Sequence, residues 1–82
     1  MHVPQDPAVA SVAVVGDFNG WNAAATPMTR HGDAWTVWIG LPGDVYEYLF
    51  VEDGTRFFPD PFATDTQPDG FGGENALLDL SL

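Results

Sequence analysis

Residues able to perform nucleophilic or acid–base catalysis are few in this sequence and poorly placed. The only histidines are His2, near the amino end, and His31, in a segment predicted to form a turn. A nucleophile needs a base within hydrogen-bond reach, and no such triad can be proposed here. The aspartates lie mainly in turns, where they are favoured for local backbone reasons rather than as catalytic pairs. We therefore predict that this chain is not an enzyme on its own.

Metal and phosphate sites are also weakly supported. Asp60, Asp65 and Asp69 share one loop and could contact Ca²⁺, but their spacing does not match the helix-flanked calcium loop, so a solvated loop is favoured. The glycines of Gly70–Gly73 lack the lysine and following helix of a phosphate-binding loop. Cysteine is absent, which excludes disulfides and thiolate metal sites. We expect no cofactor and no metal.

The aromatic residues offer a different chemistry. Three Trp, two Tyr and six Phe in 82 residues are more than one thin core can easily enclose, so some should be exposed. Trp21 lies between asparagines in a loop that contains glycine. Flat aromatic faces stack on the apolar C–H face of a pyranose, and Asn or Gln beside them can pair with vicinal hydroxyls. Trp21 is therefore a candidate ligand contact. The residues alone favour the alternative, in which its ring is partly packed against the domain.

The elements that must position these side chains are predicted to be short strands. Apolar residues alternate with polar ones between turn signals, which is typical of half-buried strands. Only 22–25 could form a turn of helix, and Thr26 and Pro27 would end it. The strands are expected at 9–15, 34–41, 45–52, 55–58 and 76–82, and a long loop rich in proline, glycine and aspartate at 59–75.

The alternation also predicts which side chains face the core. In the second strand Trp35, Val37, Ile39 and Leu41 should point inward, with Thr36 and Trp38 outward; in the third, Tyr46, Tyr48 and Phe50 share one side, opposite Glu47, Leu49 and Val51. The final strand alternates through Leu78, Leu80 and Leu82.

Together these features predict one all-β, immunoglobulin-like sandwich of about seven short antiparallel strands. Residues 1–8, with two prolines and no periodicity, are expected to be a flexible lead-in, and 9–82 the domain itself.

The charge of the chain excludes several partners. The chain has twelve acidic residues and only two basic ones, Arg30 and Arg56, which gives a formal net charge of −10. Nucleic acids and anionic membranes require a basic surface, so we expect neither as a partner. The longest apolar stretch, 8–15, contains Ser11 and is too short to span a membrane. A neutral polysaccharide is compatible with this charge.

Several motifs in order resemble those of family-48 carbohydrate-binding modules. They are VAVVGDFNGW at 12–21, the tryptophan-led segment 35–41, the Pro-Gly turn, YEYLFVEDG at 46–54, PDP at 59–61 and a late asparagine. The family includes the glycogen-binding domain of the AMP-activated protein kinase β-subunit and the amino-terminal early-set domains of branching enzymes and isoamylases. The resemblance covers nearly the whole chain from Val9, and implies a non-catalytic module that binds α-1,4-glucan such as maltooligosaccharide, glycogen or starch within a larger protein.

The resemblance also implies a set of sugar contacts. Trp21 matches the first stacking tryptophan, and Phe57 the second, although a one-residue length difference leaves Arg56 as a rival. In the late loop Phe71 matches the apolar residue that pushes through the glucan, Gly73 a small polar residue, and Asn75 the hydrogen-bonding asparagine.

One departure separates this chain from the binding members of the family. Leu49 replaces the lysine of their Y-K-F strand, which removes a charge-assisted hydrogen bond worth roughly 1.5–3 kcal/mol. Leu49 itself, Arg56 and the outward-facing Trp38 are the candidate substitute contacts. The alternative is a scaffold or docking domain that packs against the catalytic barrel of an α-glucan-active enzyme, or against a regulatory partner, and binds no sugar. The absence of cysteine and of a signal sequence favours a cytoplasmic location.

Overall fold

A computed structural model describes residues 1–4 and 6–81 of the chain. Within that part every regular element is a β-strand, and all strand pairings are antiparallel. The strands are β1 (His2–Pro4), β2 (Val12–Gly16), β3 (Thr29–His31), β4 (Ala34–Thr36), β5 (Val45–Glu52), β6 (Arg56–Phe58), β7 (Thr66–Pro68) and β8 (Glu74–Asp79). The predicted all-β class is confirmed.

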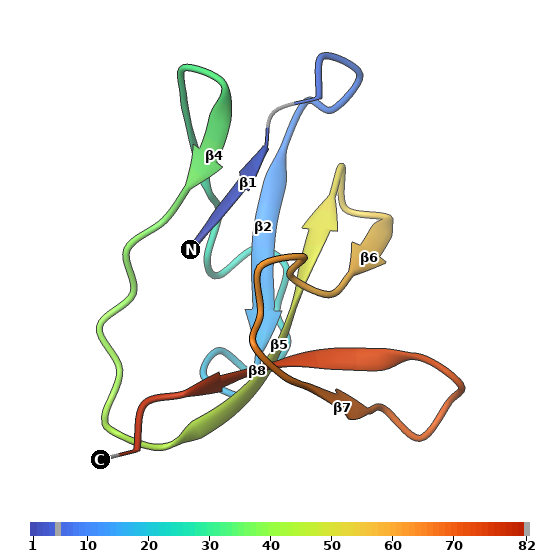
Figure 1. Cartoon of the computed structure of the whole chain (residues 1–82). Coiled ribbons are helices and arrows are strands. Elements are labelled where there is room, and N and C mark those ends of the chain that lie inside the picture. Colours follow the sequence, from blue (N-terminus) through green and yellow to red (C-terminus); the bar gives the residue numbers. More distant parts are fainter. Residues whose placement is uncertain (5, 82) are drawn as a thin grey trace.

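The strands form two sheets (Figure 1). The smaller sheet has the order β1-β4-β3, and the larger has the order β2-β5-β8-β7. Strand β5 is the centre of the larger sheet, because β2 pairs along one edge while β8 and β6 share the other edge. Its bounds are those expected from the sequence, since Tyr46, Tyr48 and Phe50 recur at every second position between the Pro-Gly and Asp-Gly turns.

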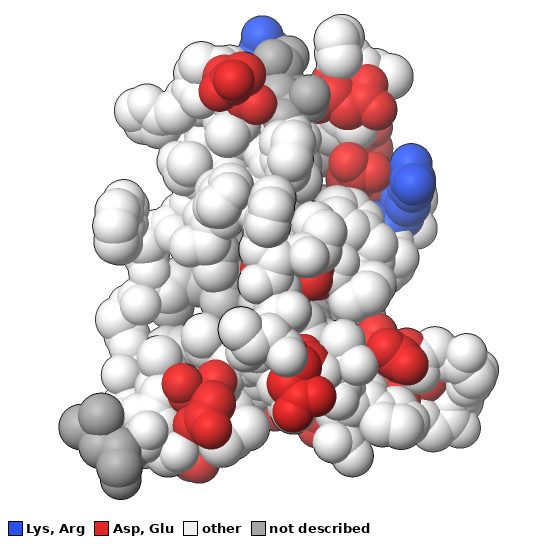
Figure 2. Space-filling model, in the orientation of Figure 1, with Lys and Arg blue, Asp and Glu red and all other residues white. Residues whose placement is uncertain are grey.

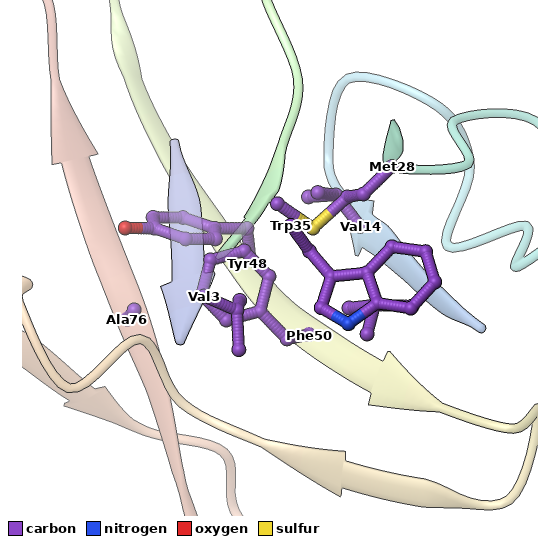
Figure 3. Packing of buried hydrophobic residues seen from close by; sticks show 8 residues of the cluster. Val3, Val14, Met28, Trp35, Tyr48, Phe50 and Ala76 are labelled. Carbon is purple, nitrogen blue, oxygen red and sulfur yellow. The ribbon is translucent and has the colours of Figure 1, made fainter. Parts of the chain in front are cut away.

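The core lies between the two sheets and is built from both. Val14 and Phe50, opposite each other on β2 and β5, are fully buried. Val3 and Trp35, which pair on β1 and β4, pack into the same cluster from the smaller sheet (Figure 3). The predicted inward position of Trp35 is confirmed, and its indole Nε1 is buried without a hydrogen-bond partner among the described residues.

The amino-terminal segment differs from the expected flexible lead-in. His2–Pro4 forms β1, and its pairing with β4 places Val3 in the core at 4% exposure. The side chain of His2 also stacks on Phe62, with ring centroids 4.8 Å apart. The burial of Val3 and the stacking of His2 on Phe62 hold this segment against the domain. The segment is too short to show the alternation by which a strand is recognised in a sequence.

The predicted strand 34–41 is shorter than expected, because β4 ends at Thr36. Residues 26–28, which precede β3 and would lie opposite the residues after β4, bond to β2 of the other sheet instead. Met28 donates its backbone N–H to Val12 O at 2.8 Å, and Thr26 O accepts from Val14 N at 3.0 Å. Val37 still exchanges backbone hydrogen bonds with Met1, its N–H donating to Met1 O at 3.2 Å. Among the described residues no strand pairs with residues 38–41, and Val37, Ile39 and Leu41 are half-buried.

The carboxyl-terminal third also contains more structure than the sequence indicates. Part of the predicted loop 59–75 forms β7, which pairs with β8 in a hairpin. The final strand begins earlier than predicted, at Glu74, and ends at Asp79. Leu82, expected in that strand, lies outside the described residues. Residues 23–25 form turns rather than helix.

Candidate functional site

The larger sheet has a second apolar cluster on the face that points away from the core. Ala13, Val15 and Val51 are buried there, and Leu49 packs against them. Leu49 pairs with Val15, and Phe57 pairs with Val51. Side chains of directly opposed residues lie on the same face of a sheet. We call this face, with Leu49, Phe57 and their neighbours, the outer face.

Asn75 also belongs to the outer face. It precedes Ala76, which is fully buried in the core, so alternation along β8 turns the Asn75 side chain outward. Its Nδ2 donates to Glu47 Oε1 at 3.3 Å, and Glu47 alternates with the buried Tyr48 in the same way. The register therefore brings together three predicted site residues, Leu49, Phe57 and Asn75.

The structure separates Phe57 from its rival Arg56. Arg56 pairs with Glu52, opposite to the outer face, and forms an ion pair with it, Nη1 to Oε1 at 3.5 Å. Phe57 is 53% exposed on the outer face. Phe57 is thus the residue of the two that can supply a flat ring beside Leu49 and Asn75.

Trp21 is held at the end of β2 by a compact turn. Asn19 closes it, because its Oδ1 accepts from Gly16 N while its Nδ2 donates to Val14 O and Thr26 Oγ1. Gly20 and Trp21 both have positive φ, 66° and 60°, the conformation that such a turn requires. The backbone N–H of Trp21 donates to Gly16 O at 3.0 Å. The indole is 39% exposed, so it is partly packed and partly available to a ligand.

A hydrogen-bonded chain joins Trp21 to the outer face through two acidic residues. The indole Nε1 donates to Asp17 Oδ1 at 3.2 Å. Asp17 Oδ2 accepts from the backbone N–H of Glu47 at 2.9 Å, and the Glu47 side chain accepts from Asn75. Sequence reasoning did not single out Asp17 or Glu47, although alternation with Leu49 already placed Glu47 on this side of its strand.

Phe71 and Gly73 lie in the β7–β8 hairpin loop, which projects from the body of the domain (Figure 1). Asp69 closes this loop, since its Oδ1 accepts from Phe71 N at 2.7 Å and Gly73 N at 3.0 Å. Phe71 is 95% exposed. A Cβ at Gly73 would lie 2.7 Å from Asp69 Oδ2, so the space for a side chain here is already occupied.

Trp38 does not lie on the outer face. It is 97% exposed and borders a groove of about 460 Å³ on the smaller sheet, together with His31, Thr36 and Val37. The structure therefore does not bring Trp38 together with Leu49, Phe57 and Asn75 as a substitute for the missing lysine.

The acidic loop residues bind their own backbone or a tyrosine. Asp60 Oδ1 accepts from Phe62 N, and its Oδ2 accepts from the Tyr48 hydroxyl at 2.7 Å. Burial, aided by this bond to a carboxylate, raises the pKa of Tyr48. Asp65 accepts from Thr66 N. Across residues 1–4 and 6–81 no group of three or more His, Asp and Glu side chains is placed to hold a metal ion.

On the face drawn in Figure 2, acidic side chains lie above and below a largely uncharged middle, and basic side chains lie at the top and at the right edge. In the described part of the chain there is no helix long and apolar enough to cross a membrane.

Comparison with known proteins identifies a family and several relatives of this chain. Residues 6–63 match the model of the carbohydrate-binding module 48 family (isoamylase N-terminal domain). The 1,4-alpha-glucan branching enzyme GlgB of Butyrivibrio fibrisolvens is 43% identical over 92% of this chain and 12% of its own length. The enzymes of the same name from Hydrogenovibrio crunogenus and Halothermothrix orenii are 44% and 40% identical over 70% of this chain, and 9% and 10% of their own lengths. The chain thus spans about a tenth of these relatives.

Proposed function

The chain belongs to the carbohydrate-binding module 48 family (isoamylase N-terminal domain), and from this premise we propose that it is a non-catalytic module that binds α-1,4-glucan. The observation that carries the proposal is the outer face. It presents the Phe57 ring, the Leu49 side chain and the Asn75 amide together, and hydrogen bonds through Asp17 and Glu47 join Trp21 to them.

Each residue of this surface has a chemical role toward a sugar. The exposed faces of Trp21 and Phe57 stack on the apolar C–H faces of glucose rings. The Asn75 Nδ2 is bonded to Glu47, which leaves the amide Oδ1 to accept a hydrogen bond from a hydroxyl. Leu49 provides apolar contact between them. Phe71, almost fully exposed on its projecting loop, contacts a longer glucan chain under this proposal.

Substitution of Trp21 by alanine tests this proposal, with Trp38→Ala as the matched control. Both changes remove one exposed indole, but only Trp21 is linked to the outer face. We expect Trp21→Ala to abolish measurable binding of maltoheptaose in isothermal titration calorimetry, whereas Trp38→Ala binds as the unaltered chain does. Thermal unfolding should show both variants folded. Equal affinities for the two variants, or no binding by the unaltered chain, would contradict the proposal.

A docking domain is the second candidate, and one observation favours it. Trp38 is almost completely exposed beside a groove, where its indole and the half-buried Val37 offer apolar surface to a partner. The relatives are about ten times longer than this chain, so the catalytic part of a parent protein is the fitting occupant. A docking domain of this kind binds no glucan, and Trp38→Ala weakens its association with a separately produced catalytic domain in analytical ultracentrifugation.

A further inference from the structure

The Glu47 carboxylate lies on the outer face. It lies on β5 with Leu49 two residues further along on the same side, and it accepts from the Asn75 amide on β8. Its own backbone N–H donates to Asp17, which holds the Trp21 indole. Glu47 is therefore bonded to Asn75 through its side chain and, through its backbone and Asp17, is linked to Trp21.

The hydrogen-bonding capacity of this carboxylate is only partly used. Its side chain is half-buried, and Oε1 accepts the single bond from Asn75 Nδ2. An ionised carboxylate can accept about four hydrogen bonds, so Oε2 can accept from the donors of a ligand. Within the described residues the only ion pair joins Arg56 to Glu52, and no cation neutralises Glu47.

A glucan can supply those donors. Each glucose unit carries hydroxyl groups, and a sugar stacked beside Leu49 brings them to the level of the carboxylate. A hydrogen bond to a charged acceptor is stronger than one between neutral groups. We propose that Glu47 is a sugar-binding residue, whose Oε2 accepts a hydrogen bond from a glucose hydroxyl. This inference rests on the proposed function and adds a contact to the same surface.

Under this proposal the protein groups on the outer face accept hydrogen bonds from the sugar, whereas a lysine on this strand would donate them. A lysine donates to sugar oxygens, whereas Glu47 and the Asn75 Oδ1 both accept. Sugar hydroxyls must then act as donors. Methylated β-cyclodextrin, whose ether oxygens cannot donate, should accordingly bind more weakly than β-cyclodextrin itself.

The substitution Glu47→Gln tests the proposal, with Glu74→Gln as the matched control. The glutamine keeps the size of the side chain and an oxygen that accepts from Asn75, but it lacks the carboxylate Oε2. Glu74 has the same charge as Glu47 and is exposed. It precedes Asn75 on β8, so alternation along the strand turns its side chain away from the outer face. Calorimetry with maltoheptaose should show about a tenfold loss of affinity for Glu47→Gln, and less than about a twofold change for Glu74→Gln.

Three results would be informative in different ways. If the unaltered chain binds maltoheptaose and Glu47→Gln binds equally well, this inference fails while the proposed function stands. If the unaltered chain binds no glucan, both fail. A second measurement covers the case of a variant that does not fold: in the unaltered chain, the carboxyl-carbon NMR shift of Glu47 should change with glucan saturation, and a constant shift would overturn the inference.

Discussion

Alanine substitution of Phe57, compared with that of Arg56, tests which of two neighbouring residues contacts glucan. The register of β5 and β6 places Phe57 opposite Val51 on the outer face, and Arg56 opposite Glu52 on the other side. A glucan on the outer face should therefore contact the Phe57 ring and not the Arg56 side chain.

The exposed area of Phe57 sets the size of the effect. An aromatic side chain has an area of about 200 Å², and Phe57 is 53% exposed, so roughly 100 Å² faces solvent. A glucose ring that covers half of it removes about 50 Å² from water, worth about 1.3 kcal/mol at 25 cal/mol per Å². Loss of the ring should weaken binding roughly ninefold. Arg56 forms an ion pair of 3.5 Å with its side chain 76% exposed, a contact worth about 0–1 kcal/mol to stability.

Calorimetry with maltoheptaose and thermal unfolding of both variants would measure these effects. We expect Phe57→Ala to lose about ninefold in affinity, Arg56→Ala to bind like the unaltered chain, and both to stay folded. The reverse order, with Arg56→Ala weakened and Phe57→Ala unchanged, would refute the assignment of the outer face as the binding surface.

Three further substitutions test other parts of the account. Leu49→Lys should tighten glucan binding about tenfold or more, because it adds a charged donor to the outer face; unchanged affinity in calorimetry would contradict this. Tyr48→Phe removes the bond to Asp60 and should lower the free energy of unfolding by about 1 kcal/mol at neutral pH. Folding raises the pKa of Tyr48, so the unaltered chain should lose stability as the pH rises above about 10, where the tyrosine of the unfolded chain ionises. The phenylalanine variant has no such ionisation, so urea unfolding should show the difference in free energy of unfolding between the two proteins becoming smaller there. Gly73→Thr should destabilise the hairpin by about 1 kcal/mol, because its Cβ displaces the Asp69 carboxylate; a melting temperature equal to that of the unaltered chain would disprove the role of Asp69.

The sequence predicted the centre of the fold well, for a physical reason. Strand β5 carries Tyr46, Tyr48 and Phe50 at every second position, which identifies its core side, and tight turns mark both of its ends. The short strands β1 and β7 were not predicted, because three residues do not show a period and β7 contains Pro68. Strand β4 was predicted too long, because no local signal shows that residues 26–28 pair with β2 instead.

The candidate site was predicted residue by residue but not as a surface. Phe57 and Arg56 could not be separated from the sequence, since a shift of one residue moves a side chain to the other face and only the register fixes that choice. The link from Trp21 through Asp17 to Glu47 joins positions 30 residues apart. No local pattern encodes such a contact.

The most direct test of glucan binding is an NMR titration of the isotope-labelled chain with maltoheptaose. If glucan binds the outer face, we expect saturable shifts at the Trp21 indole and at the amides of Glu47, Leu49, Phe57 and Asn75, with little change around Trp38. Spectra that stay constant at millimolar sugar, or shifts centred on the groove beside Trp38, would contradict it.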